Sequence, residues 1–579
     1  MKYLCVLLLL ISLVACTEEK IVNNDEPEKR LVILTDHEKG SPFTISILGA
    51  IENAFPDVKI EYIHTLSFDI YESSYLLERA VAQYPKGTYF AAIVGTGVDY
   101  KSLIIKSKGN KIVCPDNGLC TRAVLNDEDA QYYYLENEEY LDGKWNEMTD
   151  TKLYKNAIIA MLKDYEPSSF GSKAENPVKQ ELVDASSDGN QITGQILFRD
   201  NFGNFFTNIS KSLAGSLFNV GDIVEAECNN KIFFLKFGTG YSSVAKDENV
   251  CFVDFEDLLK FAVNFNSISE RYSISPGAVI KLSKANVKLA VLMYNNSRVA
   301  EDIKSGFIAQ LAAKGFVENK NLSIFVKSAN GNKAKLKDLV NDLLAGKPDI
   351  FLSVSTPASQ SALEFVPEDI PLIYTYVTDP QSAGLLGVRK NISGLSDRTN
   401  FVDYLEFVYT LLPNMKIAGN MFTSKESNSV YAKQQLEKYN NFYPFNILYE
   451  DAPEKNYFYN AYNSLKINGM EALLIVANNV ASESIGDLKL LCNSDNIPLI
   501  GDSYEHCQEG ALASISIDYD KLAIATGNMI AGVILGKSLS NEPVQYFHTD
   551  LIAINKTTAN HISYTFPAEI LAKAKYVFE

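Results

Sequence analysis

The stretch VKLAVLMYNNSRVAEDIKSGFIAQLAAKGFVENKNLSIFV, residues 287–326, decides the fold of the second half of this chain. Its apolar opening, residues 287–294, predicts a buried strand. The pattern that follows predicts a helix over residues 298–314, stopped by Gly315, and a further strand over residues 322–326. A strand, a helix and a strand in succession indicate parallel strands whose helices cover the faces of a sheet.

The same alternation continues through the rest of the chain. A helix is predicted over residues 334–345, and it ends at Gly346. The further predicted strands cover residues 349–354, 372–377, 416–422, 445–449, 472–476, 498–501 and 511–517. The pattern restarts after Asn414, so we predict two α/β lobes within residues 287–579, the second from about residue 415.

Small polar residues follow the predicted strands of both lobes. In parallel sheets, ligands bind beyond the carboxyl ends of the strands. Hydroxyl groups and free N–H groups at helix starts suit a carboxylate, whereas Asp379 or Asp502 suits an amino group. Each residue alone also fits a helix cap or a turn, but the set favours a solute-binding cleft. The candidates are Ser355, Thr356, Thr378, Asp379, Ser424, Ser427, Asn428, Ser429, Asn478, Asn479, Asp502 and Ser503.

The order and spacing of several motifs carry a family resemblance. They include Gly315-Phe316-Val317-Glu318-Asn319, Lys347-Pro348-Asp349-Ile350, Ser355-Thr356-Pro357-Ala358, Thr378-Asp379-Pro380 and Leu411-Leu412-Pro413-Asn414. Over residues 287–545 the chain resembles the substrate-binding proteins of ABC importers, in the branch associated with tryptophan and tyrosine uptake. The resemblance implies a type I fold of two lobes that close on a small molecule, with an importer permease as partner. Four tyrosines near strand ends would either stack on an aromatic ligand or pack in the core: Tyr294, Tyr374, Tyr376 and Tyr504.

The first half of the chain carries a separate set of signals. Asp36 lies just beyond the first predicted strand, residues 31–34, and suits ribose hydroxyls. Asp116 lies in the motif Pro115-Asp116-Asn117-Gly118, and the motif DNFGNFFTN covers residues 200–208. Asn204 and Asn208 of this motif can read an amide or adenine edge, although these motifs also suit turns.

Together these motifs resemble the S-adenosylmethionine (SAM) hydroxide adenosyltransferases, relatives of the SAM-dependent fluorinases and chlorinases. The likeness covers residues 31–282, with an α/β part over residues 31–175 and a β-rich subdomain over residues 176–283. It implies a SAM or nucleoside ligand, with Asp36, Asp116, Asn204 and Asn208 as candidate binding residues.

The residues that orient water in that family, an Asp, an Arg and a His, are changed here. Gly95 stands at the position of the Asp, Lys101-Ser102 falls near the Arg, and residues 149–153 contain no His. The candidate catalytic replacements are Asp99, Lys101 and Asp150. We therefore expect a domain that does not cleave SAM and either binds a nucleoside-like ligand or is structural. The alternatives are a SAM hydrolase, which releases adenosine and methionine, and a non-catalytic surface scaffold or sensor.

The first residues predict the location. Lys2 is followed by an apolar run over residues 4–13 and by Leu13-Val14-Ala15-Cys16, which resembles a bacterial lipoprotein signal. We predict a signal peptide over residues 1–15, lipidation at Cys16 and an acidic tether over residues 16–30. The apolar run is too short for a membrane-spanning helix. The protein is then anchored in a bacterial cell envelope, facing the periplasm or the cell surface.

Charge and cysteine content limit the remaining functions. The net charge of −18 argues against a nucleic-acid partner, because phosphates require a basic face. Six cysteines remain after Cys5 and Cys16, and an oxidising compartment permits disulfides. We favour a bridge between Cys492 and Cys507 over buried free thiols. No cysteine or histidine spacing matches a zinc site, so we expect no metal and no cofactor, with SAM only as substrate or ligand.

Overall fold

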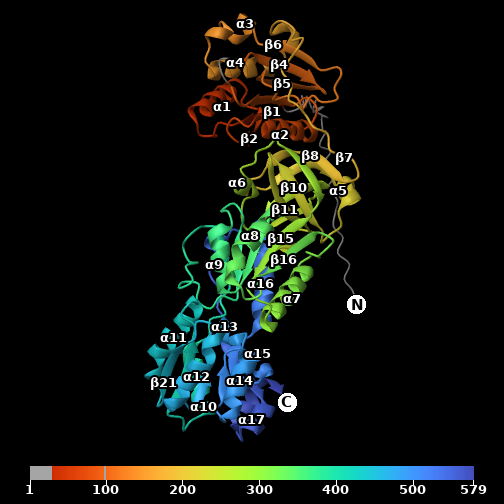
Figure 1. Ribbon diagram of the computed structural model, residues 1–579. Coiled ribbons are helices and arrows are strands. Elements are labelled where there is room, and N and C mark those ends of the chain that lie inside the picture. Colours follow the sequence, from red (N-terminus) through yellow and green to blue (C-terminus); the bar gives the residue numbers. More distant parts are fainter. Residues whose placement is uncertain (1–28, 97–99) are drawn as a thin grey trace, which may run out of the picture. The chain divides into compact units, whose positions relative to one another are not determined.

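The computed structural model describes residues 29–96 and 100–579. The predicted signal peptide, the lipidation site Cys16, most of the tether and the candidate Asp99 lie outside the described residues. The chain divides into two compact units, the first ending at Leu182 and the second running from Val183 to Glu579 (Figure 1). Among the described residues, no helix has the length and apolar character needed to cross a membrane.

The first unit is built on a six-stranded sheet with the order β2-β1-β3-β5-β4-β6. Its strands are β1 (Arg30–Thr35), β2 (Lys59–His64), β3 (Tyr89–Ile93), β4 (Ser102–Ser107), β5 (Asn110–Pro115) and β6 (Gln131–Tyr134). The first three strands and β5 are parallel, whereas β4 is antiparallel to β5 and β6. Its helices are α1 (Pro42–Ala54), α2 (Ile70–Gln83), α3 (Glu138–Leu141) and α4 (Asp150–Leu162).

Side-chain alternation along β1 places helices on both faces of this sheet. Leu31 and Ile33 pack in a core with α1 and α4. Val32 and Leu34 point to the opposite face and pack with α2. Residues 31–34 of the strand are therefore all apolar, as expected for a strand buried on both faces.

The second unit begins with a sheet that closes on itself. Its strands are β7 (Ser186–Ser187), β8 (Gln191–Arg199), β9 (Phe205–Ser210), β10 (Ile223–Cys228), β11 (Lys231–Phe237), β12 (Asn249–Val253), β13 (Leu258–Val263) and β14 (Val279–Lys284). Because β14 pairs with both β10 and β8, the sheet forms a barrel around an apolar interior. Two short helices, α5 (Lys211–Leu217) and α6 (Ile268–Tyr272), accompany it. We call residues 186–284 the β-domain.

Two lobes follow the β-domain. Lobe 1 has a parallel sheet in the order β16-β15-β17-β18-β19. Its elements are β15 (Val287–Met293), α7 (Arg298–Ala313), β16 (Leu322–Ser328), α8 (Leu336–Ala345), β17 (Ile350–Val354), α9 (Thr356–Phe365), β18 (Leu372–Thr375) and β19 (Ile392–Gly394). The predicted elements of this region are confirmed, with ends that differ by no more than two residues.

Lobe 2 has a seven-stranded sheet in the order β21-β20-β22-β23-β24-β25-β26. Its strands are β20 (Ile417–Phe422), β21 (Asn446–Asp451), β22 (Ala472–Leu474), β23 (Leu499–Gly501), β24 (Ala513–Ile517), β25 (Thr549–Asn555) and β26 (Ala574–Phe578). Its helices are α10 (Phe401–Leu411), α11 (Ser427–Asn440), α12 (Phe458–Ile467), α13 (Asn479–Ser482), α14 (Ile485–Ser494), α15 (Tyr504–Glu509), α17 (Lys556–His561) and α18 (Ala568–Lys573). Only β25 runs antiparallel to a neighbour, β24.

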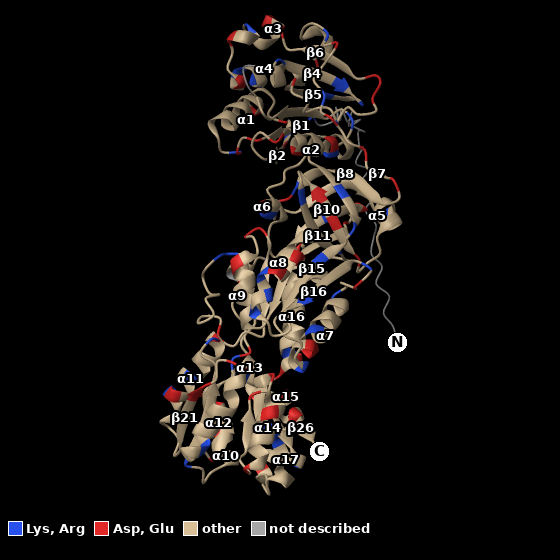
Figure 2. Ribbon diagram, in the orientation of Figure 1, with Lys and Arg blue, Asp and Glu red and all other residues tan. Residues whose placement is uncertain are grey.

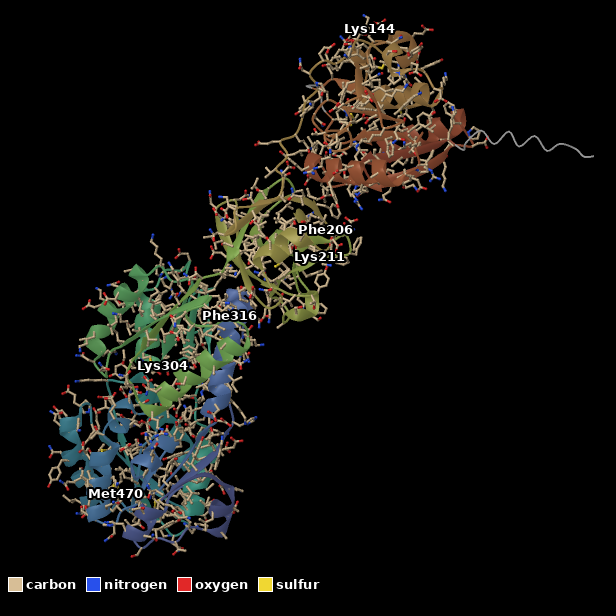
Figure 3. All side chains as sticks on the ribbon, turned by 90° about the vertical axis from the view of Figure 1, so that its right-hand side faces the viewer. Lys144, Phe206, Lys211, Lys304, Phe316 and Met470 are labelled. Atoms are coloured by element: carbon tan, nitrogen blue, oxygen red, sulfur yellow. The ribbon has the colours of Figure 1, made fainter. Side chains whose placement is uncertain are left out.

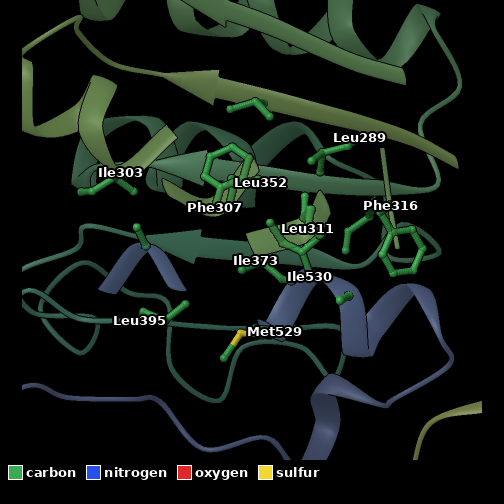
Figure 4. Close-up of a cluster of buried hydrophobic side chains, with 14 of the residues drawn as sticks. Leu289, Ile303, Phe307, Leu311, Phe316, Leu352, Ile373, Leu395, Met529 and Ile530 are labelled. Atoms are coloured by element: carbon green, nitrogen blue, oxygen red, sulfur yellow. The ribbon is translucent and has the colours of Figure 1, made fainter. Parts of the chain in front are cut away.

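The predicted division of the lobes near residue 415 is wrong in two respects. Helix α10 precedes that position and already packs in the core of lobe 2. Helix α16 (Tyr519–Ile534) comes after β24, yet it returns to lobe 1. Figure 4 shows its Ile530 beside Leu311 of α7 and its Met529 near Leu395, and all of them belong to the core of lobe 1. The chain therefore passes between the lobes after β19, after β24 and before β25.

The β-domain and lobe 1 share a hydrophobic core. Val250 and Phe252 of the β-domain belong to the same buried cluster as Val287 and Leu289 of lobe 1. The backbone N–H of Asn249 also donates to the carbonyl of Leu535, just after α16 (2.8 Å). The β-domain, which we grouped with the first α/β part from the sequence, therefore packs with lobe 1 and lies in the second compact unit.

The cysteines also correct a prediction. Cys492 and Cys507 are buried free thiols rather than a bridge. Cys492 is a residue of α14 and packs in an apolar cluster, whereas the Cys507 thiol donates to the Ala553 carbonyl (3.3 Å). Two residues that are close in sequence thus point into different parts of lobe 2.

Candidate functional site

The candidate site is a cavity between lobe 1 and lobe 2. Its volume is about 40 Å³, and residues of both lobes and of the crossovers line it. They are Asn295, Ser297, Ser355, Thr356, Tyr376, Thr378, Asp397, Asn428, Ala477, Asn478, Asn479, Ser482, Asp502, Ser503, Glu505, His506 and Tyr519. We call this space the inner cavity.

The parallel sheets bring these residues together. Ser355 follows β17 and Tyr376 follows β18 in lobe 1, whereas Ala477 and Asp502 follow β22 and β23 in lobe 2. The carboxyl ends of both sheets therefore face the same space, where ligands of such folds bind.

Strained backbone marks three of these strand ends. Ser355, Tyr376 and Ala477 adopt positive φ angles of 81°, 59° and 47°. Non-glycine residues rarely do so, and each costs about 1–3 kcal/mol unless its surroundings impose it. Asp502 helps to impose it at Ala477, because its carboxylate accepts the Ala477 N–H (2.7 Å). Such strain is typical of a binding site.

Two carboxyl groups give the inner cavity its electrostatic character. Burial raises the pKa of Asp397 to about 7, and the nearby charge of Asp502 adds to the effect. Burial raises the pKa of Asp502 to about 6. Among the described residues, neither Lys nor Arg lines this cavity. A cationic group placed there would restore the ionised form of both carboxyls.

Several buried polar atoms of the inner cavity have no hydrogen-bond partner among the described residues. They include Ser355 Oγ, Asp397 Oδ1 and Asn428 Oδ1. A buried polar atom without a partner costs about 1–3 kcal/mol. These atoms come from lobe 1, a crossover and lobe 2, so one polar ligand can satisfy all three.

A histidine and aromatic rings complete the wall. Burial lowers the pKa of His506 to about 4, so its ring is neutral, and its Nε2 lies 2.8 Å from Ser482 Oγ. The rings of Tyr376 and Tyr519 meet edge to face with centroids 5.8 Å apart. Tyr504 packs behind Tyr519 with its centroid 6.1 Å away. Tyr374, in contrast, is buried in the core of lobe 1, where packing was the alternative prediction.

A wider cavity of about 550 Å³ lies beside Asn428 and also spans both lobes. Tyr294 and Gln360 line it from lobe 1, and Ser427 and Glu483 line it from lobe 2. Direct hydrogen bonds join the lobes here: Asn295 Nδ2 donates to Glu483 Oε1 (3.0 Å), and Gln360 Nε2 donates to Ser427 Oγ (3.4 Å). The lobes are therefore held together around the inner cavity.

The predicted solute-binding residues divide into three groups. The residues that line the inner cavity are Ser355, Thr356, Thr378, Asn428, Asn478, Asn479, Asp502 and Ser503. Ser427 lines the wider cavity. The other three have structural contacts: Asp379 pairs with Arg398, Ser429 Oγ accepts the Thr423 N–H (2.9 Å), and the Ser424 N–H donates to Asp451 (3.0 Å).

Sequence reasoning missed several lining residues. Asp397 lies on the crossover after β19, outside any strand or helix, and Tyr519 is the first residue of α16, just after the crossover from β24. Asn478 and Ser503 carry a second role, since each caps the helix that it precedes. A residue at a strand end can therefore be a helix cap and a cavity residue at once.

In the first unit, the candidates from sequence have local partners. Asp36 accepts the Phe68 N–H (3.0 Å), and Asp116 accepts the Val178 N–H (2.8 Å). Lys101 pairs with Glu136 (3.3 Å) and lies over the Tyr134 ring. Asp150 is the first residue of α4, where its charge suits the helix dipole. These contacts give all four residues structural roles.

The β-domain holds a cavity of about 640 Å³, lined by Phe202, Asn204, Tyr241, Val263, Asn264, Phe265, Asn266 and Ser267. The exposed fractions of Phe202 and Phe265 are 78% and 84%. Asn204 donates to Asp200 (2.9 Å) and to the Tyr241 hydroxyl (3.2 Å), so its amide orientation is fixed. Asn208, in contrast, is held within the sheet by Val183 and Gln195. Only Asn204 of this pair lies in the cavity.

A lysine supports this arrangement from behind. Lys260 pairs with Asp200 (3.1 Å), and its Nζ lies 4.2 Å from the ring centroid of Phe206, which Figure 3 labels on the β-domain. Both charged side chains are mostly buried, so Asp200 is held in place to orient Asn204.

Comparison with known proteins identifies the family. The family model described as ABC transporter substrate binding protein matches residues 286–578, half of the chain. The chain belongs to this family. Proteins of this kind bind a small molecule outside the cytoplasm and work with a transporter. The predicted α/β class and two-lobed fold are confirmed.

The chain is also similar to individual proteins. A "Tyrosine-binding protein" of Clostridioides difficile (strain R20291) is 30% identical over 259 residues, which are 44% of this chain and 74% of that protein. The ABC domain in complex with L-Trp from Streptococcus pneumonia is 26% identical. The match covers 51% of this chain and 100% of that chain, with a TM-score of 0.48. The ligand-free, open structure of CD0873 from Clostridium difficile is 25% identical. The match covers 50% of this chain and 99% of that chain, with a TM-score of 0.42.

The first half of this substrate-binding protein matches a second family. The SAM hydroxide adenosyltransferase N-terminal domain matches residues 31–171, and the corresponding C-terminal domain matches residues 194–281. The predicted resemblance is confirmed, and the two domain matches are followed by the substrate-binding domain in one chain.

Proposed function

We propose that this protein is the lipid-anchored receptor of an ABC importer and that it captures an amino acid with an aromatic side chain. The observation that carries the proposal is the pair Asp397 and Asp502, which face an inner cavity whose lining has no Lys or Arg among the described residues. An ammonium group fits this pair. Tyr376 and Tyr519 add aromatic surface, and the curated relative is called a tyrosine-binding protein.

Binding in this site requires the lobes to part. A volume of about 40 Å³ has room for a few water molecules, whereas an amino acid needs more. Opening breaks the Asn295–Glu483 and Gln360–Ser427 hydrogen bonds, and closure restores them with the ligand enclosed.

Thermal-shift measurements on the whole chain with each aromatic amino acid test this proposal. We expect ligand to raise the unfolding temperature, because it binds only the folded state. The Asp397→Asn variant keeps the shape and removes the charge, so affinity should fall by about tenfold to a hundredfold. Asp369→Asn, at an exposed turn, is the matched control and should bind like the wild type. Equal affinity for Asp397→Asn and Asp369→Asn would refute an ammonium site.

For the first half, we propose nucleoside binding without SAM cleavage. Support comes from the exposed Phe202 and Phe265 beside the fixed Asn204 amide, since aromatic rings stack on bases. Chromatography of SAM incubated with the protein should show no adenosine beyond the control without enzyme. Sustained release would show the alternative, a SAM hydrolase.

Binding can be tested separately from cleavage. Phe202→Ala should weaken adenosine or SAM binding in calorimetry, because it removes one ring of the cavity. Phe255→Ala is the matched control, since Phe255 is 90% exposed in the same domain but does not line the cavity. Absence of binding by the wild-type protein would favour a scaffold or sensor.

The lipid anchor is a proposal from the sequence around Cys16. Metabolic labelling with a fatty acid should mark the wild-type protein and not a Cys16→Ser variant. Labelling of both proteins would contradict lipidation at this cysteine.

A further inference from the structure

Two cysteines of the first unit lie against each other. Cys114 is in β5 and Cys120 is in the turn that follows, and their sulfur atoms are 2.8 Å apart. The exposed fractions of the two residues are 0% and 7%. A disulfide bond is about 2.05 Å long, so bond formation requires the sulfurs to approach by less than about 1 Å.

The turn between them is wound so that it returns Cys120 to the strand. Gly118 has a positive φ of 90°, and its carbonyl accepts the Thr121 N–H (3.1 Å). Asn117 Oδ1 accepts the Leu119 N–H (3.2 Å). The backbone itself therefore holds the two side chains in register.

We propose that Cys114 and Cys120 form a disulfide bond when this protein reaches the oxidising compartment in which its family works. The oxidant is a small or protein disulfide. The Cys120 thiolate attacks one sulfur of that disulfide and releases the other as a thiol, and the Cys114 sulfur then displaces the oxidant from the mixed disulfide. The two cysteines together lose two electrons and two protons, and the oxidant becomes two thiols.

A cavity gives the oxidant access to the pair. It has a volume of about 320 Å³, and both cysteines line it together with Val124, Tyr132 and Val178. Burial raises the pKa of the Cys114 thiol. Cys120, which is the more exposed of the two, therefore supplies the attacking sulfur.

The bond would fasten a loop that carries Asp116, a candidate ligand residue, and its neighbour Asn117. Asn117 donates to the Val94 carbonyl (3.0 Å), and Asp116 accepts the Val178 N–H (2.8 Å). Closing the loop at both ends restricts its motion in the folded state and in the unfolded chain. The disulfide would thus stabilise the loop at the carboxyl ends of β3 and β5.

Peptide mapping tests the bond directly, because one tryptic peptide, residues 112–122, contains both cysteines. The whole protein is incubated with oxidised glutathione, unfolded in acid and labelled with a maleimide, with and without prior reduction. We expect the unreduced peptide to carry no label and to be two mass units lighter than the dithiol form. After reduction it should carry two labels. Two labels without reduction would overturn the proposal.

The peptide of residues 247–260 is an internal control, because it contains only Cys251 and should be labelled once in both samples.

A second measurement tests whether the disulfide stabilises the loop. Reduction should lower the unfolding temperature of the first unit in the wild type and in a Cys251→Ser variant, but not in Cys120→Ser. If reduction left the unfolding temperature of the wild type unchanged, the disulfide would not stabilise the loop.

Discussion

At the scale of single residues, the inner cavity depends on carboxyl groups that are partly protonated near neutral pH. Burial raises the pKa of Asp397 to about 7 and that of Asp502 to about 6. The rings of His506, Tyr376 and Tyr519 stay neutral over this range, since the pKa of His506 is about 4 and burial raises the pKa of both tyrosines well above 10. Burial also raises the pKa of Glu505, which lines the same cavity, so this carboxyl adds to the pH dependence.

Affinity for a cationic ligand should therefore rise with pH between 5 and 8. The ligand favours the ionised carboxyls, so binding below pH 7 must release protons. We expect the dissociation constant to increase by up to about tenfold for each pH unit below the pKa. Calorimetry in buffers of different ionisation enthalpy measures the released protons. Affinity that stays constant from pH 5 to 8 would contradict a direct contact with these carboxyls.

The same raised pKa values affect the stability of the ligand-free protein. An unfolded Asp has a pKa near 3.9. Between pH 4 and 7 the folded protein therefore holds more protons on these two residues than the unfolded chain does. Their contribution to the free energy of unfolding is greatest below pH 4 and is lost as pH rises through 6 to 7. A bound ammonium group stabilises the ionised carboxyls and so offsets this loss of stability. Ligand binding therefore favours the closed form of the cavity.

At the scale of elements, the end of α7 shows how sequence sets structure. Gly315 follows the helix with a positive φ of 101°. Its N–H donates to the Ala312 carbonyl (3.0 Å), and the next N–H, of Phe316, donates to Leu311 (2.9 Å). Phe316 then enters the core, as Figure 4 shows. The glycine was predicted as a helix stop, and its backbone conformation explains why.

A Gly315→Ala substitution should lower the free energy of unfolding of the second unit by about 1–2 kcal/mol, because a Cβ disfavours this φ. The added Cβ would also lie 3.3 Å from the Gly221 carbonyl oxygen of the β-domain. Denaturant unfolding followed by circular dichroism measures the change.

Gly215→Ala in α5 is the matched control and should have the opposite sign. That glycine is helical, and a Cβ built on it meets nothing within 4 Å. We expect the Gly215→Ala substitution to raise the free energy of unfolding of the second unit by up to about 1 kcal/mol. Equal effects of the two substitutions would contradict the role of the positive φ.

At the scale of the whole molecule, the boundary of the substrate-binding domain is set by packing. The family match begins at residue 286, but the core of lobe 1 continues into the β-domain through residues such as Phe234 and Phe252. Charged residues of both signs are scattered over the elements of the chain (Figure 2). The buried residues that the β-domain and lobe 1 share are apolar, so hydrophobic packing holds the two together.

A fragment of residues 287–579 should consequently be less stable than a fragment of residues 184–579. The shorter fragment exposes the apolar face that Val287, Leu289 and Phe316 share with the β-domain. We expect a lower unfolding temperature and aggregation, measured by differential scanning fluorimetry and light scattering. Equal unfolding temperatures would show that the shared core contributes little.

The sequence by itself determined the local elements and the family. Apolar strands, capped helices and glycine stops depend on neighbouring residues, so β15, α7 and β16 were predicted nearly to their ends. Most of the predicted cavity residues follow from the same rule, because parallel strands bring their carboxyl ends together.

Only the tertiary structure decided what depends on contacts between distant segments. These are the return of α16 to lobe 1, the core that the β-domain shares with that lobe, and the place of Asp397 opposite Asp502. The same holds for the cysteines, since Cys114 meets Cys120 while Cys492 and Cys507 point apart. Spacing along a chain sets which side chains can meet, but packing selects which of them do.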